Sequence, residues 1–314
     1  MVIYYKEGHP EQIKRLARNV EVRKYKGETI KCKNFFCCYN PDIVDNVEAN
    51  MYAHIIHCDY KKVSFSPIIN PKFNKYIAVS KLAGESFKEL TGKDYELIYN
   101  PIKIEKPNVS KYNDGVLHLI SATRLTKEKG LKRMQKLAKI LDKSGIDYEW
   151  LVYTNRHREG IGKNAIYKEP KLDIIEDIAK ADALVQLSDC ESYCYSVVES
   201  LMTGTKVIVT DLPVFKELGI EHGKNAVICN MEMTNVDLDL IKKDMTFKYK
   251  PPKSTWDKYL DNNSTYDPDK KRKVRLKKNI YLVQEGIHKT RGDIVEITNV
   301  RASELECKDL VEII

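Results

Sequence analysis

Apolar runs and segments of helical spacing alternate along the middle of the chain. Apolar residues recur three and four positions apart from Leu131 to Leu141, which predicts an amphipathic helix that ends at Gly145. The expected order is strand 115–125, helix 129–145, strand 148–154, helix 172–182, strand 183–188, helix 196–204, strand 206–211 and strand 225–230. Because apolar strands that alternate with helices form parallel sheets covered on both faces, the pattern predicts a Rossmann-like α/β domain over residues 110–262.

Two further regions flank this domain. Residues 1–109 predict a shorter Rossmann-like domain, in which a strand at 73–80 leads into a helix with Ser80 as N-cap and Gly92 just past its end. The polar segment 103–115 is expected to link the two domains. Residues 272–314 read as strands separated by a glycine-containing turn, which predicts a small β-rich module.

Composition narrows the class of protein. Hydrophobic residues make up 42% of the 314 positions and charged residues 31%, which is typical of a folded soluble protein. No apolar run approaches the ~20 residues of a membrane helix, and the first residues lack a signal-peptide core, so a cytoplasmic protein is expected. The eight cysteines show no paired C-x-x-C spacing, which favours free thiols over a disulfide frame or a zinc site.

The charge balance leaves two interpretations open. Lys and Arg number 53 against 45 Asp and Glu, giving a net charge of +8. This favours an anionic partner such as phosphate, nucleic acid or an acidic membrane surface, or simply a lysine-rich solvated surface. The run KKRKVRLKK at 270–278 is expected to be a solvated strand edge, with a nucleic-acid contact as the alternative.

Charged side chains follow the strands at the edge where doubly wound domains bind ligands. Arg124 and Lys129 come after the strand at 115–125, and such a basic pair suits a diphosphate. Glu191 and Glu199 stand eight positions apart around the start of the helix at 196–204. A carboxylate inside such a helix can accept hydrogen bonds from a ribose diol. The alternative is a solvated helix face.

Three ordered segments resemble one enzyme family. They are AVSKLAGESFKELTGKDYELIYNPI at 78–102, SATRLTKEKGL at 121–131 and DALVQLSDCESYCYSVVESLMTGTKVIVTD at 182–211. Together they are similar to GT-B-fold retaining glycosyltransferases of the family 4-like group, also called glycosyl transferases group 1. The resemblance implies an α/β protein with two Rossmann-like domains that face a cleft. The family usually has glycine at the positions of Ser192 and Cys194, where this chain departs from it.

The resemblance also implies roles on the donor side. Glu199 would hold the ribose of a nucleotide sugar, and Glu191 would face hydroxyls of the transferred sugar. Arg124 and Lys129 would stabilise the diphosphate leaving group, so that no metal is expected.

The remaining implied contacts come from backbone and from the first domain. The backbone amides of Cys194, Tyr195 and Ser196 would meet the phosphates. His57, in the segment HIIHCDY, would reach the sugar, with Asp59 nearby. The alternative for His57 is a histidine that only packs in the core.

These observations predict transfer of a sugar from a nucleotide diphosphate sugar, with UDP-glucose or UDP-N-acetylglucosamine as the leading donors and retention expected. The acceptor stays open among a glycan, a protein and nucleic acid, and the oligomeric state is open. A bacterial or bacteriophage origin is suggested by the family and by the appended module. The alternatives are a catalytically inactive sugar-nucleotide-binding or scaffold protein, and a phage-type transferase that modifies nucleic acid or protein.

Overall fold

The computed structural model describes the residues 2–5, 21–38, 41–155, 160–171, 173–259, 271–277, 280–282, 287–298 and 311–313. The chain divides into two compact units, one formed by Ala53–Ser254 and the other by Met1–Tyr52 together with Thr255–Ile314. This division falls at other positions than the predicted domain boundaries at 109/110, 262 and 272. Those boundaries stay predictions.

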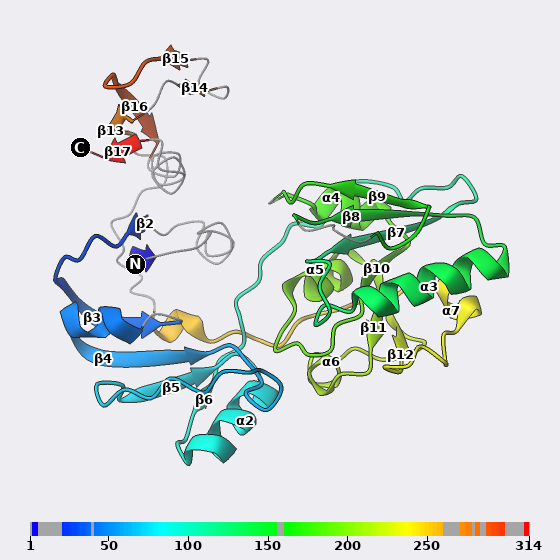
Figure 1. Cartoon of the computed structure of the whole chain (residues 1–314), viewed down its shortest axis with the longest axis horizontal. Helices are drawn as coiled ribbons and strands as arrows, with labels where there is room; N and C mark the ends of the chain where they lie inside the picture. The colour runs from blue at the N-terminus through cyan, green and yellow to red at the C-terminus, as the bar shows by residue number, and fades with distance from the viewer. Residues whose placement is uncertain are drawn as a thin grey trace. The chain divides into compact units, whose positions relative to one another are not determined.

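The largest sheet confirms the predicted doubly wound pattern. Its six strands are β7 (Leu117–Ala122), β8 (Tyr148–Tyr153), β9 (Ala165–Lys168), β10 (Ala183–Gln186), β11 (Lys206–Thr210) and β12 (Ala226–Cys229). They are all parallel and lie in the order β12-β11-β10-β7-β8-β9 (Figure 1). The direction of winding therefore reverses between β7 and β10, which makes this pair the topological switch point.

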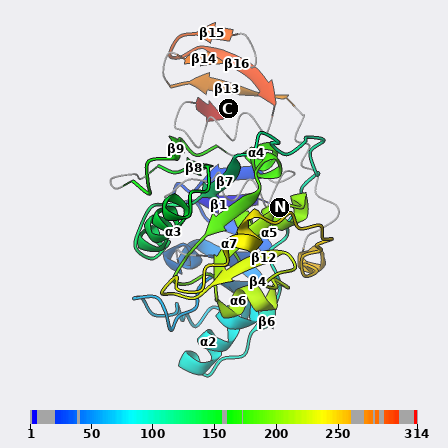
Figure 2. The ribbon, with the colours of Figure 1, turned by 90° about the vertical axis from the view of Figure 1, so that its right-hand side faces the viewer.

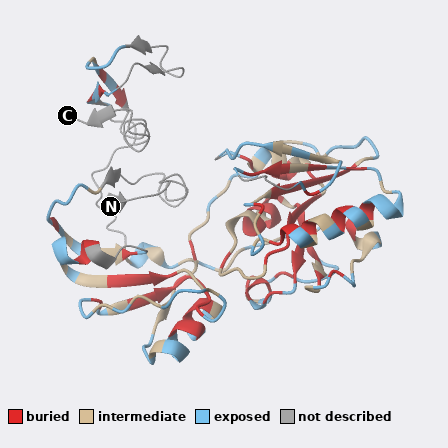
Figure 3. Ribbon diagram, in the orientation of Figure 1, coloured by how far each residue is buried: buried red, intermediate tan, exposed pale blue. Residues whose placement is uncertain are grey.

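Helices cover both faces of this sheet. They are α3 (Leu131–Ser144), α4 (Ile175–Lys180), α5 (Tyr195–Thr203), α6 (Pro213–Glu217) and α7 (Leu238–Lys242). Residues of α3 and α7 belong to one buried cluster with the strands, whereas α5 contacts α4, β10 and β11. Figure 2 shows α3 and α5 on opposite sides of the strands, and Figure 3 colours β10 and β11 as buried.

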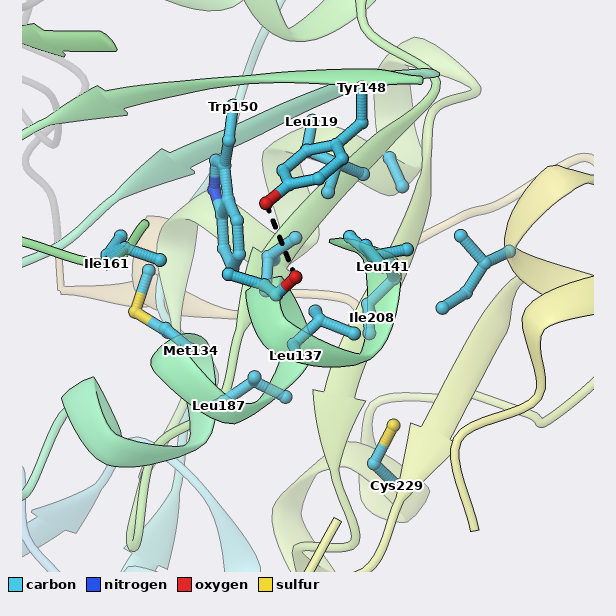
Figure 4. Packing of buried hydrophobic residues seen from close by; sticks show 14 of the residues in the cluster. Leu119, Met134, Leu137, Leu141, Tyr148, Trp150, Ile161, Leu187, Ile208 and Cys229 are labelled. Atoms are coloured by element: carbon cyan, nitrogen blue, oxygen red, sulfur yellow. Dashed lines mark hydrogen bonds between the residues drawn. The ribbon is translucent and has the colours of Figure 1, made fainter. Parts of the chain in front are cut away.

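The core between α3 and the sheet is apolar and closely filled (Figure 4). Met134, Leu137 and Trp150 have no exposed surface. The one polar atom of the Trp150 ring is satisfied, because Nε1 donates to Ser121 Oγ at 3.0 Å. Burial of this apolar surface, at about 25 cal/mol per Å², is what holds α3 and hence the loop before it in place.

A second sheet contains β3 (Ile30–Cys37), β4 (Val47–Ile56), β5 (Lys75–Ala78) and β6 (Glu96–Leu97) in that order, and β4 runs across the border of the two compact units. The helix α2 (Lys81–Thr91) has the predicted ends. Ser80 accepts the Ala83 N–H at 3.2 Å, and Gly92 takes the left-handed φ of 68° that closes the helix.

The glutamate at the end of α6 joins that helix to α2. The Glu217 carboxylate accepts the N–H groups of Lys81 at 2.6 Å and Leu82 at 3.3 Å, at the positive end of the α2 dipole. Burial raises the pKa of Tyr99 to about 12, and a hydrogen bond to Glu217 adds to the effect. The Glu217 carboxylate thus joins the start of α2, which follows β5, to the end of α6, which follows β11.

The other elements belong to the second compact unit. They are β1 (Val2–Tyr5), β2 (Glu21–Lys24), η1 (Pro41–Asn46), η2 (Trp256–Lys258), β13 (Lys271–Leu276), β14 (Ile280–Leu282), β15 (Ile287–Lys289), β16 (Ile294–Thr298) and β17 (Val311–Ile313). The last five lie where the β-rich module was predicted. The prediction that the basic run 270–278 forms the edge of a sheet is wrong. Its strand β13 is the central strand of the antiparallel sheet β16-β13-β17. Its Lys273 and Arg275 are exposed, and residues 270 and 278 lie outside the described residues.

The contact between the loop after β7 and the loop after β10 is unusually close. Gly130, the N-cap of α3, has a φ of 82°, and a Cβ built on it would lie 1.8 Å from the Leu187 carbonyl oxygen. The Arg133 side chain reinforces the contact, since its Nε donates to the same carbonyl at 2.7 Å and its guanidinium pairs with Asp189. The backbone N–H of Asp189 in turn donates to the Glu128 carbonyl at 2.9 Å.

A buried lysine holds the end of α7. Lys206 is 2% exposed, and its Nζ donates to the Ile241 carbonyl at 2.6 Å and the Lys243 carbonyl at 2.5 Å. Burial lowers the pKa of Lys206 from its ordinary 10.5 to about 8, and repulsion from Lys111 acts in the same direction. The amine therefore loses its proton in the folded protein before it does so in the unfolded chain.

This lysine predicts a rise of stability with pH between about 8 and 10.5. In that window the unfolded chain binds more protons than the folded protein, so the free energy of unfolding increases as pH rises. We expect the wild type to gain about 1–2 kcal/mol relative to Lys206→Met between pH 7.5 and 9.5 in urea unfolding. Parallel curves for the two proteins would show that the amine titrates normally.

The two glycines at the ends of α3 provide a second prediction. Gly145→Ala places a Cβ in open space at a φ of 71° and should cost only the left-handed strain, about 1 kcal/mol. Gly130→Ala adds a clash with backbone and should lower the free energy of unfolding by about 3 kcal/mol. Urea unfolding of both variants separates strain from clash. Equal losses would mean that the two loops can move apart freely.

Candidate functional site

The candidate residues of the donor side gather at the switch point of the large sheet. Ligands of doubly wound sheets bind outside the carboxyl ends of the strands where the winding direction reverses. Here these are the ends of β7 at Ala122 and β10 at Gln186. Arg124 and Lys129 follow the first strand and Glu191 follows the second, so strand order alone brings these three charges to one place.

Glu191 is held through one of its two carboxylate oxygens. Its Oε1 accepts hydrogen bonds from Lys129 Nζ at 2.7 Å, Ser188 Oγ at 2.7 Å and Gln186 Nε2 at 3.2 Å. The Glu191 side chain is 10% exposed and that of Lys129 is 22% exposed. This carboxylate is therefore set in the loop and is not part of a solvated helix face.

Lys129 and Glu191 stabilise each other's charge. Burial by itself lowers the pKa of Lys129, but the Coulombic attraction of Glu191 and its hydrogen bond outweigh it, so the pKa of Lys129 lies above its ordinary value. Lys129 is thus a cation at every physiological pH. Repulsion from Arg124, a smaller influence, lowers the pKa of the same ammonium group.

Arg124 differs from Lys129 in its exposure. Its side chain is 52% exposed, and its guanidinium lies 3.5 Å from Glu128, which is a weak surface pair. An exposed guanidinium keeps its donors available for an anion. The basic pair therefore combines one fixed cation, held by Glu191, with one that can reorient.

At the start of α5, a non-glycine residue has a backbone conformation that glycine usually adopts. Cys194 is the N-cap residue and lies in the left-handed region with a φ of 62°. A side chain there costs about 1 kcal/mol or more, which is why glycine is usual in such positions. The amides of Tyr195 and Ser196 open the nine-residue helix, as the sequence predicted. Burial, with repulsion from Glu191 next, raises the pKa of the Cys194 thiol to about 12, so the thiol is neutral.

Glu199 lies inside α5 and is 4% exposed. The position excludes the solvated-face alternative for this residue as well. Its predicted role toward a ribose is not tested by the fold and stays a prediction.

His57 and Asp59 follow β4, inside the same compact unit as the large sheet. Burial lowers the pKa of His57 to about 4, with repulsion from His54 as the second cause, so the imidazole is neutral at pH 7. Burial raises the pKa of Cys190 to about 11, and the Asp59 charge adds to the shift.

Sequence reasoning missed two residues of the site. Gln186 and Ser188 are buried at the end of β10 and donate hydrogen bonds to Glu191. The sequence feature that could have identified them is a pair of polar residues in the otherwise apolar segment 183–188.

Within the described ranges, no group of three or more His, Cys, Asp and Glu side chains is arranged to hold a metal ion. No helix in the described part of the chain has the length and apolar character to cross a membrane. Metal independence stays a prediction.

Comparisons with known proteins bear on the family and on the fold. Residues 103–238 match the family model "Glycosyl transferases group 1". No curated protein matches the sequence. Among solved structures, HepE from Anabaena in complex with UDP and glucose is similar with a TM-score of 0.57 and 14% identity, over 76% of this chain and 88% of that one. A second HepE structure, in complex with UDP-glucose, has a TM-score of 0.54 and 15% identity, over 74% of this chain and 87% of that one.

A variant of TarM from S. aureus, in complex with fondaparinux, alpha-GlcNAc-glycerol and UDP, is also similar. Its TM-score is 0.53 at 15% identity, over 63% of this chain, and the chain spans only 45% of that protein's length. At such identities the likeness shows the fold, which is the GT-B fold that the sequence predicted. Residues 103–238 therefore resemble the glycosyl transferases group 1 family, and the fold of the chain is the GT-B fold.

Proposed function

We propose that this protein transfers a sugar from a nucleotide diphosphate sugar to an acceptor, with UDP-glucose or UDP-N-acetylglucosamine as donor and without a metal ion. The observation that carries the proposal is the ion pair of Lys129 with Glu191 at the switch point, with Arg124 in the same loop as Lys129. A cation fixed next to a carboxylate suits a ligand that carries a diphosphate and sugar hydroxyls side by side. The UDP-containing structures of HepE and TarM support the choice of nucleotide.

The diphosphate would lie at the opening of α5. Amide groups at a helix N-terminus and the positive end of its dipole favour phosphate, and the left-handed backbone at Cys194 turns the chain into that helix. Glu199, within α5, would accept hydrogen bonds from the ribose. Ser196 and Tyr195 would contribute backbone rather than side chain to the phosphates.

The reaction breaks the bond between the anomeric carbon and the diphosphate oxygen. The electron pair stays on the diphosphate, and Arg124 and Lys129 stabilise the charge that develops there. This is the task that a divalent cation performs in other transferases, and two nearby positive side chains supply the same charge.

The acceptor hydroxyl oxygen forms the new bond to the anomeric carbon. We propose retention, in which the acceptor approaches on the face that the leaving group departs from. The leaving diphosphate is then the base nearest to the hydroxyl proton and takes it up. His57, neutral at pH 7, would hydrogen-bond the sugar without competing for the diphosphate.

The test is binding and turnover by the purified protein. We expect UDP-glucose or UDP-N-acetylglucosamine to raise the melting temperature, because a ligand of the folded state stabilises it by mass action. Glu199→Gln keeps the shape of the side chain and removes the charge that a ribose diol needs. It should weaken donor binding about 10- to 100-fold in calorimetry, the loss expected for hydrogen bonds to a charged group.

Glu176→Gln is the matched control. Glu176 lies on α4 with its side chain 64% exposed, so this variant makes the same charge change away from the site and should bind the donor as the wild type does. Release of UDP from the donor, slow with water as acceptor, distinguishes an enzyme from a binding protein. Donor binding without any release of UDP would contradict the transferase, and no binding of either donor would contradict the site.

A further inference from the structure

Two buried polar side chains lie at the end of β10, where the packing of the sheet does not require polar groups. Gln186 and Ser188 are 2% and 0% exposed. Burial of a polar side chain costs free energy unless its hydrogen bonds are made, and an apolar residue would serve the sheet at lower cost. Both side chains instead reach Glu191 Oε1, and Gln186 Nε2 also donates to Ser188 Oγ at 2.6 Å.

The backbone beneath these side chains is fixed from neighbouring strands. The Ser188 carbonyl accepts a hydrogen bond from Thr210 Oγ1, at the end of β11, at 2.6 Å. The Leu187 carbonyl accepts from Arg133 Nε on α3 at 2.7 Å. The Ser188 hydroxyl is thus presented from a position that cannot easily shift, which makes it a directional donor.

The three hydrogen bonds to Glu191 from described residues all end on Oε1. A carboxylate oxygen has two lone pairs, so Oε1 is fully occupied. Among the described residues no donor is bonded to Oε2. The carboxylate therefore has one oxygen committed to the protein and one left to accept from a ligand.

Lys129 has two interaction partners in the proposed function, Glu191 and the diphosphate. In this structure it donates to Glu191, and in the proposed function it also faces the diphosphate. When a diphosphate with two negative charges draws the ammonium group toward itself, the hold of Lys129 on Glu191 weakens. Gln186 and Ser188 are neutral and have no attraction of comparable strength to the diphosphate, so their bonds persist.

We propose that Gln186 and Ser188 are positioning residues for the donor sugar, and this rests on the proposed function. They occupy Glu191 Oε1 and fix the plane of the carboxylate, so that Oε2 alone accepts a hydrogen bond from one hydroxyl of the transferred sugar. They also keep Glu191 in place when Lys129 turns to the diphosphate. The sugar is therefore recognised through a single acceptor of fixed direction, which favours one hydroxyl configuration.

The experiment compares UDP with UDP-glucose and UDP-N-acetylglucosamine in calorimetry, because UDP lacks the sugar. For whichever of the two donors binds the wild type more tightly, Ser188→Ala should weaken binding about 3- to 10-fold, the value of one hydrogen bond. Its affinity for UDP should stay within about twofold of the wild type. Gln186→Met, which removes the amide at similar volume, should show the same split, and it decides the matter if Ser188→Ala does not fold.

Ser200→Ala is the matched control. Ser200 is as buried as Ser188 and donates one hydrogen bond, to the Thr205 carbonyl at 2.9 Å, without contacting Glu191. We expect it to lower the melting temperature as Ser188→Ala does and to leave the preference for donor over UDP unchanged.

Three outcomes would overturn the proposal, and they are distinguishable. If Ser188→Ala weakens UDP and the UDP-sugar equally, the residue only supports the loop. If both affinities stay at the wild-type value, Glu191 does not depend on it. If the wild type binds neither UDP nor a UDP-sugar, the proposed function fails, and the positioning role fails with it. In turnover, a positioning role should raise KM for the donor and lower kcat/KM, with the melting temperature no lower than that of Ser200→Ala.

Discussion

At Gly130 the loop after β7 lies so close to the Leu187 carbonyl that no methyl group fits between them. This approach joins two loops that are far apart in sequence but follow neighbouring strands. The Arg133 side chain and the backbone bond from Asp189 to Glu128 close the same gap. Strand order places the loops of Lys129 and Glu191 at one edge of the sheet, and the approach holds those loops against each other. The charge arrangement of the site therefore rests on strand order and on the packing of these two loops.

The electrostatics of the Lys129–Glu191 pair bears on the proposed function. An ion pair that is largely removed from water costs desolvation on both sides, and its mutual attraction does not always compensate. The Lys129–Glu191 pair is therefore weak evidence for a stabilising role. In the proposed function, a diphosphate and a sugar would contact these two groups when the donor binds. The extra donors Gln186 and Ser188 fit this view, since they reduce the cost of holding the carboxylate.

Much of the fold could be predicted from the sequence, because apolar runs and helix ends are local signals. The caps at Ser80 and Gly92 and the strands β7, β8, β10, β11 and β12 are where the pattern predicted them. The strand β9 was missed, since it is short and its side chains alternate between intermediate and exposed. The short helices α6 and α7 were missed too. Their five residues give little periodicity, and contacts such as Lys206 with the end of α7 fix them. The Glu191 network joins residues brought together by strand order, which no local pattern reports.

The proposed phosphate site includes a position where the sequence departs from the family that it resembles. Cys194 stands where glycine is usual, yet its backbone keeps the left-handed conformation at φ 62°. Glycine adopts that conformation without cost, whereas cysteine pays about 1 kcal/mol or more for it. A chain that no longer needed the turn into α5 could relax to an ordinary backbone after losing the glycine. That the turn persists under strain indicates that the surrounding contacts still enforce it, and strain of this kind is concentrated at functional sites. The departure from the family motif therefore changes the side chain near the proposed phosphates and leaves their backbone cradle intact.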